Sequence, residues 1–161
     1  MATATLEKPC TETINRAGKY LTFTLGEENF GLEILNIREI MQVLNITPVP
    51  NTPHHIKGVV NIRGKVIPIV DLRLKFNMPE VEHTVQTCII VVYVGAAEIG
   101  LIVDRVSEVM DIHEDDIEDT PDFGTDIDTN ALLGISKAAG RVTILLDIHR
   151  VLRAEDFEKV L

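Results

Sequence analysis

The sequence contains an internal repeat, and this feature constrains the fold more than any other. The segment from Leu25 to Ile34 returns from Val94 to Val103 with both of its glycines in place, 69 residues later (100 minus 31). A second phrase, GKVIPIVDL from Gly64, returns as GRVTILLDI from Gly140, 76 residues later. Two matches in the same order and at similar spacing predict a duplicated unit of about seventy residues.

The residues within each unit favour strands. Leu21, Phe23 and Leu25 alternate with threonines, which is the period of a half-buried strand. Apolar residues make up 45% of the chain, but aromatics only 4%, so the interior must be built of Val, Ile and Leu, which favour strands. Each unit supplies two hairpins and flanking strands, enough for a small barrel. We expect a mainly β fold of two similar barrels packed together.

Two helices and one edge strand are also predicted. The first helix is indicated by apolar residues on one helical face of Glu33–Leu44, and the second closes the chain from Asp147. The apolar residues are Ile34, Ile37, Ile40, Met41 and Leu44 in the first, and Ile148, Val151, Leu152 and Phe157 in the second. Because proline has no N–H to donate to a neighbouring strand, Pro68 predicts that the strand Lys65–Val70 lies at an edge.

Charge and hydropathy limit the partners and the location. The net charge is -10 and the Lys and Arg residues are scattered, so nucleic acid and membrane surfaces are not expected partners. Residues 1–19 have no apolar block of signal-peptide length, and the run around Cys88–Val94 is too short to span a bilayer. We therefore expect a soluble, cytoplasmic protein in which Cys88 is a buried, inert thiol.

Patterns that carry chemistry are weak. The segment Gly134–Ala138 resembles a nucleophile elbow around Ser136 but lacks its last glycine, and we interpret it as a hairpin. The acidic segment Asp111–Asp128 has three ligand positions of a calcium loop, yet Ala131 and Lys137 replace the required Gly and Glu. We predict no metal, cofactor or catalytic residue. The alternative is a small hydrolase or metal-dependent enzyme using Ser136 or this acidic loop.

Four segments together resemble one family, the CheW-like chemotaxis coupling proteins. They are NIRGKVIPIVDLR at Asn61–Arg73, the preceding NTPHHIKGVV, YLTFTLGEENFGLEI from Tyr20, and IGLIVDRVSEVM from Ile99. The resemblance covers nearly everything from Tyr20 to Leu152, and the NxRGxxxPxxDL pattern is specific to such domains.

The resemblance implies a fold and a role. The fold is two SH3-like five-stranded β-barrels with short helices and a C-terminal helix. We expect a flexible tail at 1–18, a domain at 19–152 with subdomains at roughly 19–84 and 85–152 whose terminal strands can exchange, and a helix end at 153–161. The implied role is a non-catalytic scaffold that links the cytoplasmic tips of methyl-accepting chemotaxis receptors to the histidine kinase CheA, at the inner face of the membrane.

The resemblance also implies a receptor-binding surface on matching positions. These are Leu21, Ile34, Ile37, Glu39, Gly58, Arg63 and Val106, with Asn61 and Gly64 shaping the turn that carries Arg63. Taken without the family, Arg63 fits an ordinary surface arginine, the two isoleucines fit core packing, and Glu39 fits an ion pair with a nearby Lys or Arg. The implied kinase contact lies at Leu44–Pro50 or at Gly134–Gly140.

Overall fold

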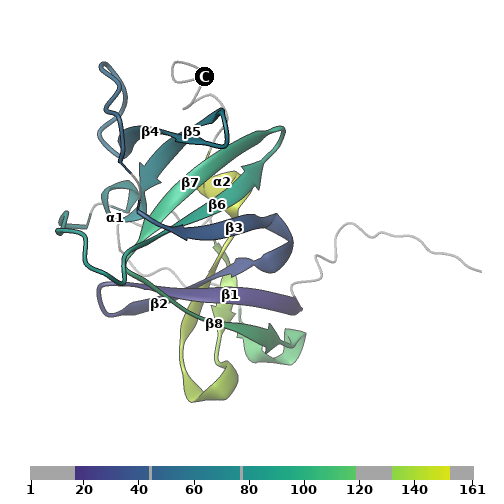
Figure 1. The fold of residues 1–161 in the computed structure, drawn as a ribbon. Coiled ribbons are helices and arrows are strands. Elements are labelled where there is room, and N and C mark those ends of the chain that lie inside the picture. Colours follow the sequence, from purple (N-terminus) through teal and green to yellow (C-terminus); the bar gives the residue numbers. More distant parts are fainter. Residues whose placement is uncertain (1–16, 44, 77, 119–131, 153–161) are drawn as a thin grey trace, which may run out of the picture.

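Two β-sheets make up the structure (Figure 1), a computed structural model that describes residues 17–43, 45–76, 78–118 and 132–152. The six-stranded sheet has the order β8 (Arg105–Ile112), β1 (Gly18–Leu25), β2 (Glu28–Glu33), β11 (Thr143–Leu146), β10 (Leu132–Ser136) and β9 (Ile117–Glu118). The five-stranded sheet has the order β3 (Ile37–Gln42), β6 (Cys88–Val94), β7 (Ala97–Val103), β5 (Lys65–Asp71) and β4 (Ile56–Ile62). The prediction of a mainly β fold is confirmed.

The helices are short. They are α1 (Leu72–Lys75), α2 (Ile148–Val151) and the 3-10 turns η2 (Ile34–Asn36), η3 (Glu114–Asp116) and η5 (Ala138–Gly140). Asp71 and Asp147, which are equivalent in the repeat, cap α1 and α2 by accepting the backbone N–H of Arg73 and of His149. Of the predicted closing helix, the described residues contain only the turn α2, which ends before Leu152, whose backbone is extended (φ -116°, ψ 125°). Residues 153–161, with Phe157, lie outside the described residues.

The repeat is confirmed by the way the strands pair. In one sheet β2 runs parallel to β11, with Gly31 opposite Leu145; in the other β7 runs parallel to β5, with Gly100 opposite Ile69. Gly31 and Gly100 are equivalent at the 69-residue offset, and Ile69 and Leu145 at the 76-residue offset. Each sheet therefore combines strands from both copies. The expected boundary between residues 84 and 85 stays a prediction.

The glycine shared by both copies allows this parallel pairing. A Cβ on Gly100 would lie 2.6 Å from Cδ1 of Ile69 and 2.8 Å from Cγ2 of Ile89, and a Cβ on Gly31 would lie 3.0 Å from Cδ2 of Leu145. Both distances at Gly100 are shorter than van der Waals contact, so the strands pack closely only because this position has no side chain.

Three apolar clusters form the interior. The largest, the central cluster, lies between the sheets and contains Phe23, Phe30 and Leu32 from one and Val92 and Leu101 from the other. Two smaller clusters lie within the individual sheets, one around Ile67 and Val91 and one around Tyr20 and Leu145. Because all three consist mostly of branched aliphatic residues, the predicted Val, Ile and Leu interior is confirmed.

The prediction of a helix at Glu33–Leu44 is wrong. Only the turn η2 is helical, and residues 37–42 form β3, whose side chains alternate between half-buried and exposed. Ile40, expected on the buried face, is exposed. Pairing with β6 decided the outcome, because the β-branched isoleucines fit a strand as well as a short helix. Leu44 lies outside the described residues.

The edge position predicted for Lys65–Val70 is wrong for the strand as a whole, since β5 lies between β4 and β7. Its pairing with β7 begins only at Ile69, however, so Lys65–Pro68 pair with β4 alone. Pro68 is tolerated for a local reason. Pro68 faces Val59, whose N–H and C=O both bond with Thr47, at 2.9 and 2.8 Å, on the side away from β5. Pro68 and Val59 therefore exchange no hydrogen bond, and the N–H that proline lacks is not needed for pairing with β4. The same bonds return the chain after β3 to β4, the strand at the other edge of the sheet, as in a closed barrel.

Cys88 differs slightly from the prediction. Its side chain is half-buried rather than buried, and the thiol donates to the carbonyl oxygen of Gln86 at 3.2 Å.

We predict that Gly100→Ala destabilises the fold by about 1–3 kcal/mol, the usual effect of overpacking. The added methyl group would collide with Ile69 and Ile89. Urea unfolding measures the change. Ile69→Val, which removes the nearer of the two clashing atoms, should restore part of the loss in the double variant, and Val66→Ala at an exposed position should change stability by less than about 0.5 kcal/mol. An unaltered midpoint in Gly100→Ala would contradict the close packing.

Candidate functional site

Arg63 occupies the tip of the β4–β5 hairpin in a left-handed conformation. Its φ is 53° and that of Gly64 is 83°, the two positive values of a type I′ hairpin turn. The side-chain oxygen Oδ1 of Asn61 accepts the N–H of Gly64 at 2.9 Å and closes the turn. This turn holds the base of the arginine side chain in a defined position, while 66% of the side chain remains exposed.

The guanidinium of Arg63 forms a two-pronged ion pair with Glu39 of β3. Nη1 lies 2.8 Å from Oε2 and Nη2 lies 3.0 Å from Oε1, the fork geometry that matches a carboxylate. The hydrogen bond from Arg63 is the main cause that lowers the pKa of Glu39. Because β3 and β4 are the two outer strands of the five-stranded sheet, this pair joins the ends of the sheet.

The ion pair continues into a row of five charges, which we call the ladder: Arg63, Glu39, Arg38, Glu98 and Lys65. Nη1 of Arg38 lies 3.3 Å from Glu39 and 2.9 Å from Glu98. The other oxygen of Glu98 accepts from Nζ of Lys65 at 2.6 Å, and this bond is the main cause that lowers the pKa of Glu98. Nothing in the sequence pattern marked Arg38, Glu98 or Lys65. The closest signal is that Arg38 adjoins Glu39.

The apolar members of the predicted set gather at the margin of the central cluster. Ile34, Ile37 and Val106 are half-buried and pack against it, whereas Leu21 is fully inside. Two exposed apolar residues accompany them: Leu35, with 87% of its surface exposed, and Val109, opposite Leu21 in the pairing of β8 with β1. We call Ile34, Leu35, Ile37, Val106 and Val109 the seam, since it borders both sheets.

A bulge in β3 brings the seam and the ladder onto one strand. Ile37 faces Val92 on β6, and Glu39 faces the next residue, Val91, so Arg38 is the extra residue. Ile37 and Glu39 therefore point to opposite faces although they are two residues apart. Ile37 packs on the central cluster, and Glu39 lies on the face of the cluster around Val91.

Gly58 lies apart from both groups. A Cβ there would come within 2.1 Å of the carbonyl oxygen of Thr47, and its φ is 144°. The structure thus explains this glycine by the close approach of Thr47 to β4 rather than by an exposed surface.

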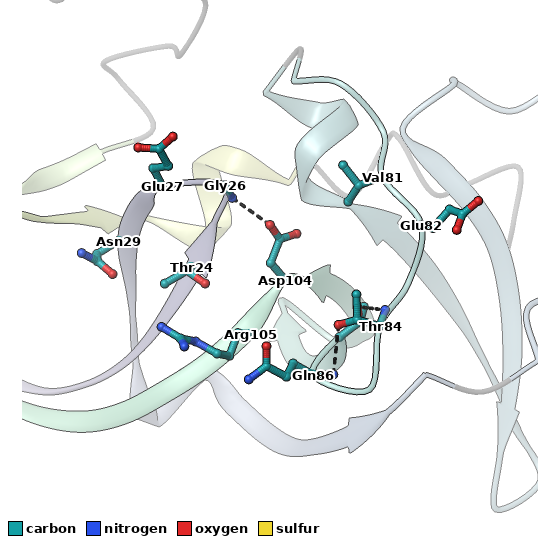
Figure 2. Close-up of a pocket in the computed structure, with 11 residues that line it drawn as sticks. Thr24, Gly26, Glu27, Asn29, Val81, Glu82, Thr84, Gln86, Asp104 and Arg105 are labelled. Carbon is teal, nitrogen blue, oxygen red and sulfur yellow. Dashed lines mark hydrogen bonds between the residues drawn. The ribbon is translucent and has the colours of Figure 1, made fainter.

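A separate hollow of ≈ 540 Å³ lies at the junction of the two sheets and is lined mainly by polar groups (Figure 2). On its wall, Oδ2 of Asp104 accepts the N–H of Gly26 at 2.8 Å, and Oδ1 accepts from Nε of Arg73 at 2.8 Å. Asp104 therefore ties the β1–β2 turn to the segment after β5. Arg73 is the main cause that lowers the pKa of Asp104.

The residues considered for catalysis have structural environments. Ser136 is fully buried in the β10–β11 hairpin, where its Oγ accepts the N–H of Ala138 at 3.1 Å. Within the described ranges, no group of three His, Cys, Asp or Glu side chains is placed to hold a metal ion. Asp119–Asp128 of the acidic loop lie outside those ranges. None of the described helices has the length and hydropathy needed to cross a membrane.

Comparison with known proteins gives a consistent result. A model of the CheW-like domain matches residues 19–156. The chemotaxis protein CheW of Klebsiella aerogenes is 38% identical over 157 residues, covering 98% of this chain and 93% of the relative. The protein FrzA of Myxococcus xanthus is 30% identical over 122 residues, 76% of each chain.

A solved structure is also similar. The scaffolding protein TtCheW from Thermoanaerobacter tengcongensis matches with a TM-score of 0.79 and 36% identity, over 87% of this chain and 95% of that one.

We predict that Asp104→Asn destabilises the fold by about 1–3 kcal/mol at pH 7, the scale of hydrogen bonds to a charged group. Because the folded state lowers the pKa of Asp104, this contribution is present above the unfolded value near about 3.9 and is lost as pH falls through the folded value. Urea unfolding of both proteins at pH 7 and near pH 3 should show a difference that shrinks in acid. Asp111→Asn, in the exposed pair with Lys19, is the control and should change little.

Proposed function

The chain belongs to the family of CheW-like domains, and on this premise we propose that it couples methyl-accepting chemotaxis receptors to the histidine kinase CheA. It is a chemotaxis coupling protein and a scaffold without a catalytic step of its own. Coupling then consists of holding receptor and kinase together, so that the state of the receptor sets the rate of kinase autophosphorylation. This places the protein in the cytoplasm, at the inner face of the membrane.

The observation that carries the receptor proposal is the exposed fork of Arg63 on Glu39, which lies on β3, the strand that also carries Ile37 of the seam. Receptor tips in this family are helical hairpins, which present an apolar stripe flanked by polar residues. The seam offers apolar side chains at the margin of the central cluster, worth about 25 cal/mol for each Å² removed from water. Arg63, mostly exposed, offers a directional bond to a carboxylate.

The remaining positions of the proposed surface would pack beneath it, add contact area or orient Arg63. Leu21 packs beneath the seam, and Gly58 permits the closure of the barrel that carries the Arg63 hairpin. Ile34, Ile37 and Val106 supply contact area, and Glu39 orients Arg63 in the free protein. For the kinase, we propose the ends of the barrels, at Leu44–Pro50 or Gly134–Gly140; the second of these is the β10–β11 hairpin.

A reconstitution tests the function directly. Purified protein, a soluble receptor-tip fragment and CheA are mixed, and complex formation is followed by size-exclusion chromatography together with kinase autophosphorylation. We expect a ternary complex and a changed rate of phosphorylation. Absence of the complex with an unchanged rate would refute coupling. Crosslinking within the complex would then decide between the two kinase contacts.

We predict that Arg63→Ala weakens binding of the receptor fragment by roughly 5- to 150-fold, the range of a lost charged interface contact. Because the arginine is exposed, Tm should change by no more than about 2 °C. Isothermal titration calorimetry and thermal unfolding measure the two effects. Arg141→Ala is the matched control: Arg141 pairs with Glu108, the repeat equivalent of Glu39, and lies outside the proposed surface. A collapse of Tm in Arg63→Ala would make the arginine structural instead.

A further inference from the structure

The ladder holds one more positive charge than negative. Three cations, Arg63, Arg38 and Lys65, alternate with two carboxylates, Glu39 and Glu98. The exposed fraction of the side chain varies along it: 66% for Arg63, 22% for Glu39, 33% for Arg38, 11% for Glu98 and 56% for Lys65. Glu98 accepts hydrogen bonds from two cations and is the least exposed member, so its position is the most restrained. Arg63 is the most exposed member and the most accessible to a further carboxylate.

The second copy of the repeat shows that the fold does not require a ladder. At the 69-residue offset, Ser107 and Asn29 stand in place of Arg38 and Glu98; at the 76-residue offset, Ala139 stands in place of Arg63. The backbone is nevertheless the same there, since Ala139 has φ 59° and Gly140 has φ 73°. Among the described residues, the equivalent of Glu39, Glu108, forms one ion pair, with Arg141 at 2.6 Å.

In the part of the chain that the structure describes, the same structural position therefore has one ion pair in one half and a row of five charges in the other. A purely structural role for Arg38 and Glu98 leaves this difference without a reason. The bulge at Arg38 provides the geometry for another role, because it turns this residue so that a single nitrogen, Nη1, reaches both carboxylates of the ladder.

We propose that Arg38, held by Glu98, is a reserve partner for Glu39, so that Arg63 can leave Glu39 for a carboxylate of the receptor. This rests on the proposed function. If Arg63 left Glu39 without a partner, much of the binding free energy gained from the receptor carboxylate would be lost, because the half-buried carboxylate of Glu39 has lost part of its hydration. Arg38 lies 3.3 Å from Glu39, and a small shift shortens this contact while Glu98 retains Lys65. Arg38 and Glu98 are thus positioning residues for Arg63.

The first test needs no receptor. NMR titration of the Glu39 carboxyl group compares wild type, Arg63→Ala, Arg38→Ala and the double variant. In Arg63→Ala, Arg38 should take over, and the pKa of Glu39 should stay below the ordinary glutamate value; in the double variant it should return to that value or rise above it, because burial raises the pKa of this carboxyl group. Arg141→Ala, the control in the other half, should leave the pKa of Glu39 unchanged. Equal values in Arg63→Ala and in the double variant would overturn the proposal.

The second test is a double-mutant cycle on binding of the receptor-tip fragment. Arg38→Ala should weaken binding about three- to tenfold while Arg63 is present, and should have no effect in the Arg63→Ala background, where no exchange of partners takes place. Arg38→Lys should recover part of the loss, and Glu98→Gln should resemble Arg38→Ala. Equal binding by wild type and Arg38→Ala would refute a reserve role. If wild type itself fails to bind, the proposed function fails, and the titration alone decides the reserve role.

Discussion

Parallel pairing between the two copies of the repeat is the constraint on which the rest of the structure depends. β2 pairs with β11 and β7 pairs with β5, each across a glycine that lets the backbones approach. Since every sheet contains strands from both copies, neither copy can bury its apolar residues without the other. The central cluster between the sheets follows from this exchange, and the seam is the margin where that cluster meets solvent.

The position of the candidate surface follows from the ends of the five-stranded sheet. β3 and β4 are its outer strands, and they are joined by the contact of Thr47 with Val59 and by the ion pair of Arg63 with Glu39. The bulge at Arg38 then lets one strand serve two faces, apolar toward the central cluster and charged toward the end of the barrel. A scaffold needs such a surface to be rigid, and closure of the sheet provides that rigidity.

Comparison of the two halves separates folding from function. Both halves keep the glycine at the parallel contact, the capping aspartate and the left-handed turn, so these features serve the fold. At the equivalent positions, only one half has an arginine at the turn, Arg63, and a second carboxylate, Glu98, where the other half has Ala139 and Asn29. Duplication preserves what packing requires and leaves the exposed positions free to diverge, because a change in an exposed charge has little effect on stability.

The sequence by itself determined the duplication, the mainly β fold and the family, because strand period and glycine placement are local and are repeated along the chain, and the NxRG pattern is local. It also pointed to Arg63 and Glu39 as site residues, but it did not show that they form an ion pair with each other. Only the tertiary structure decided that residues 37–42 form a strand and that β5 lies inside its sheet. It alone assembled the ladder, whose members come from β3, β5, β7 and the turn after β4. These outcomes depend on pairing between strands distant in sequence, and no local pattern encodes which strands will meet.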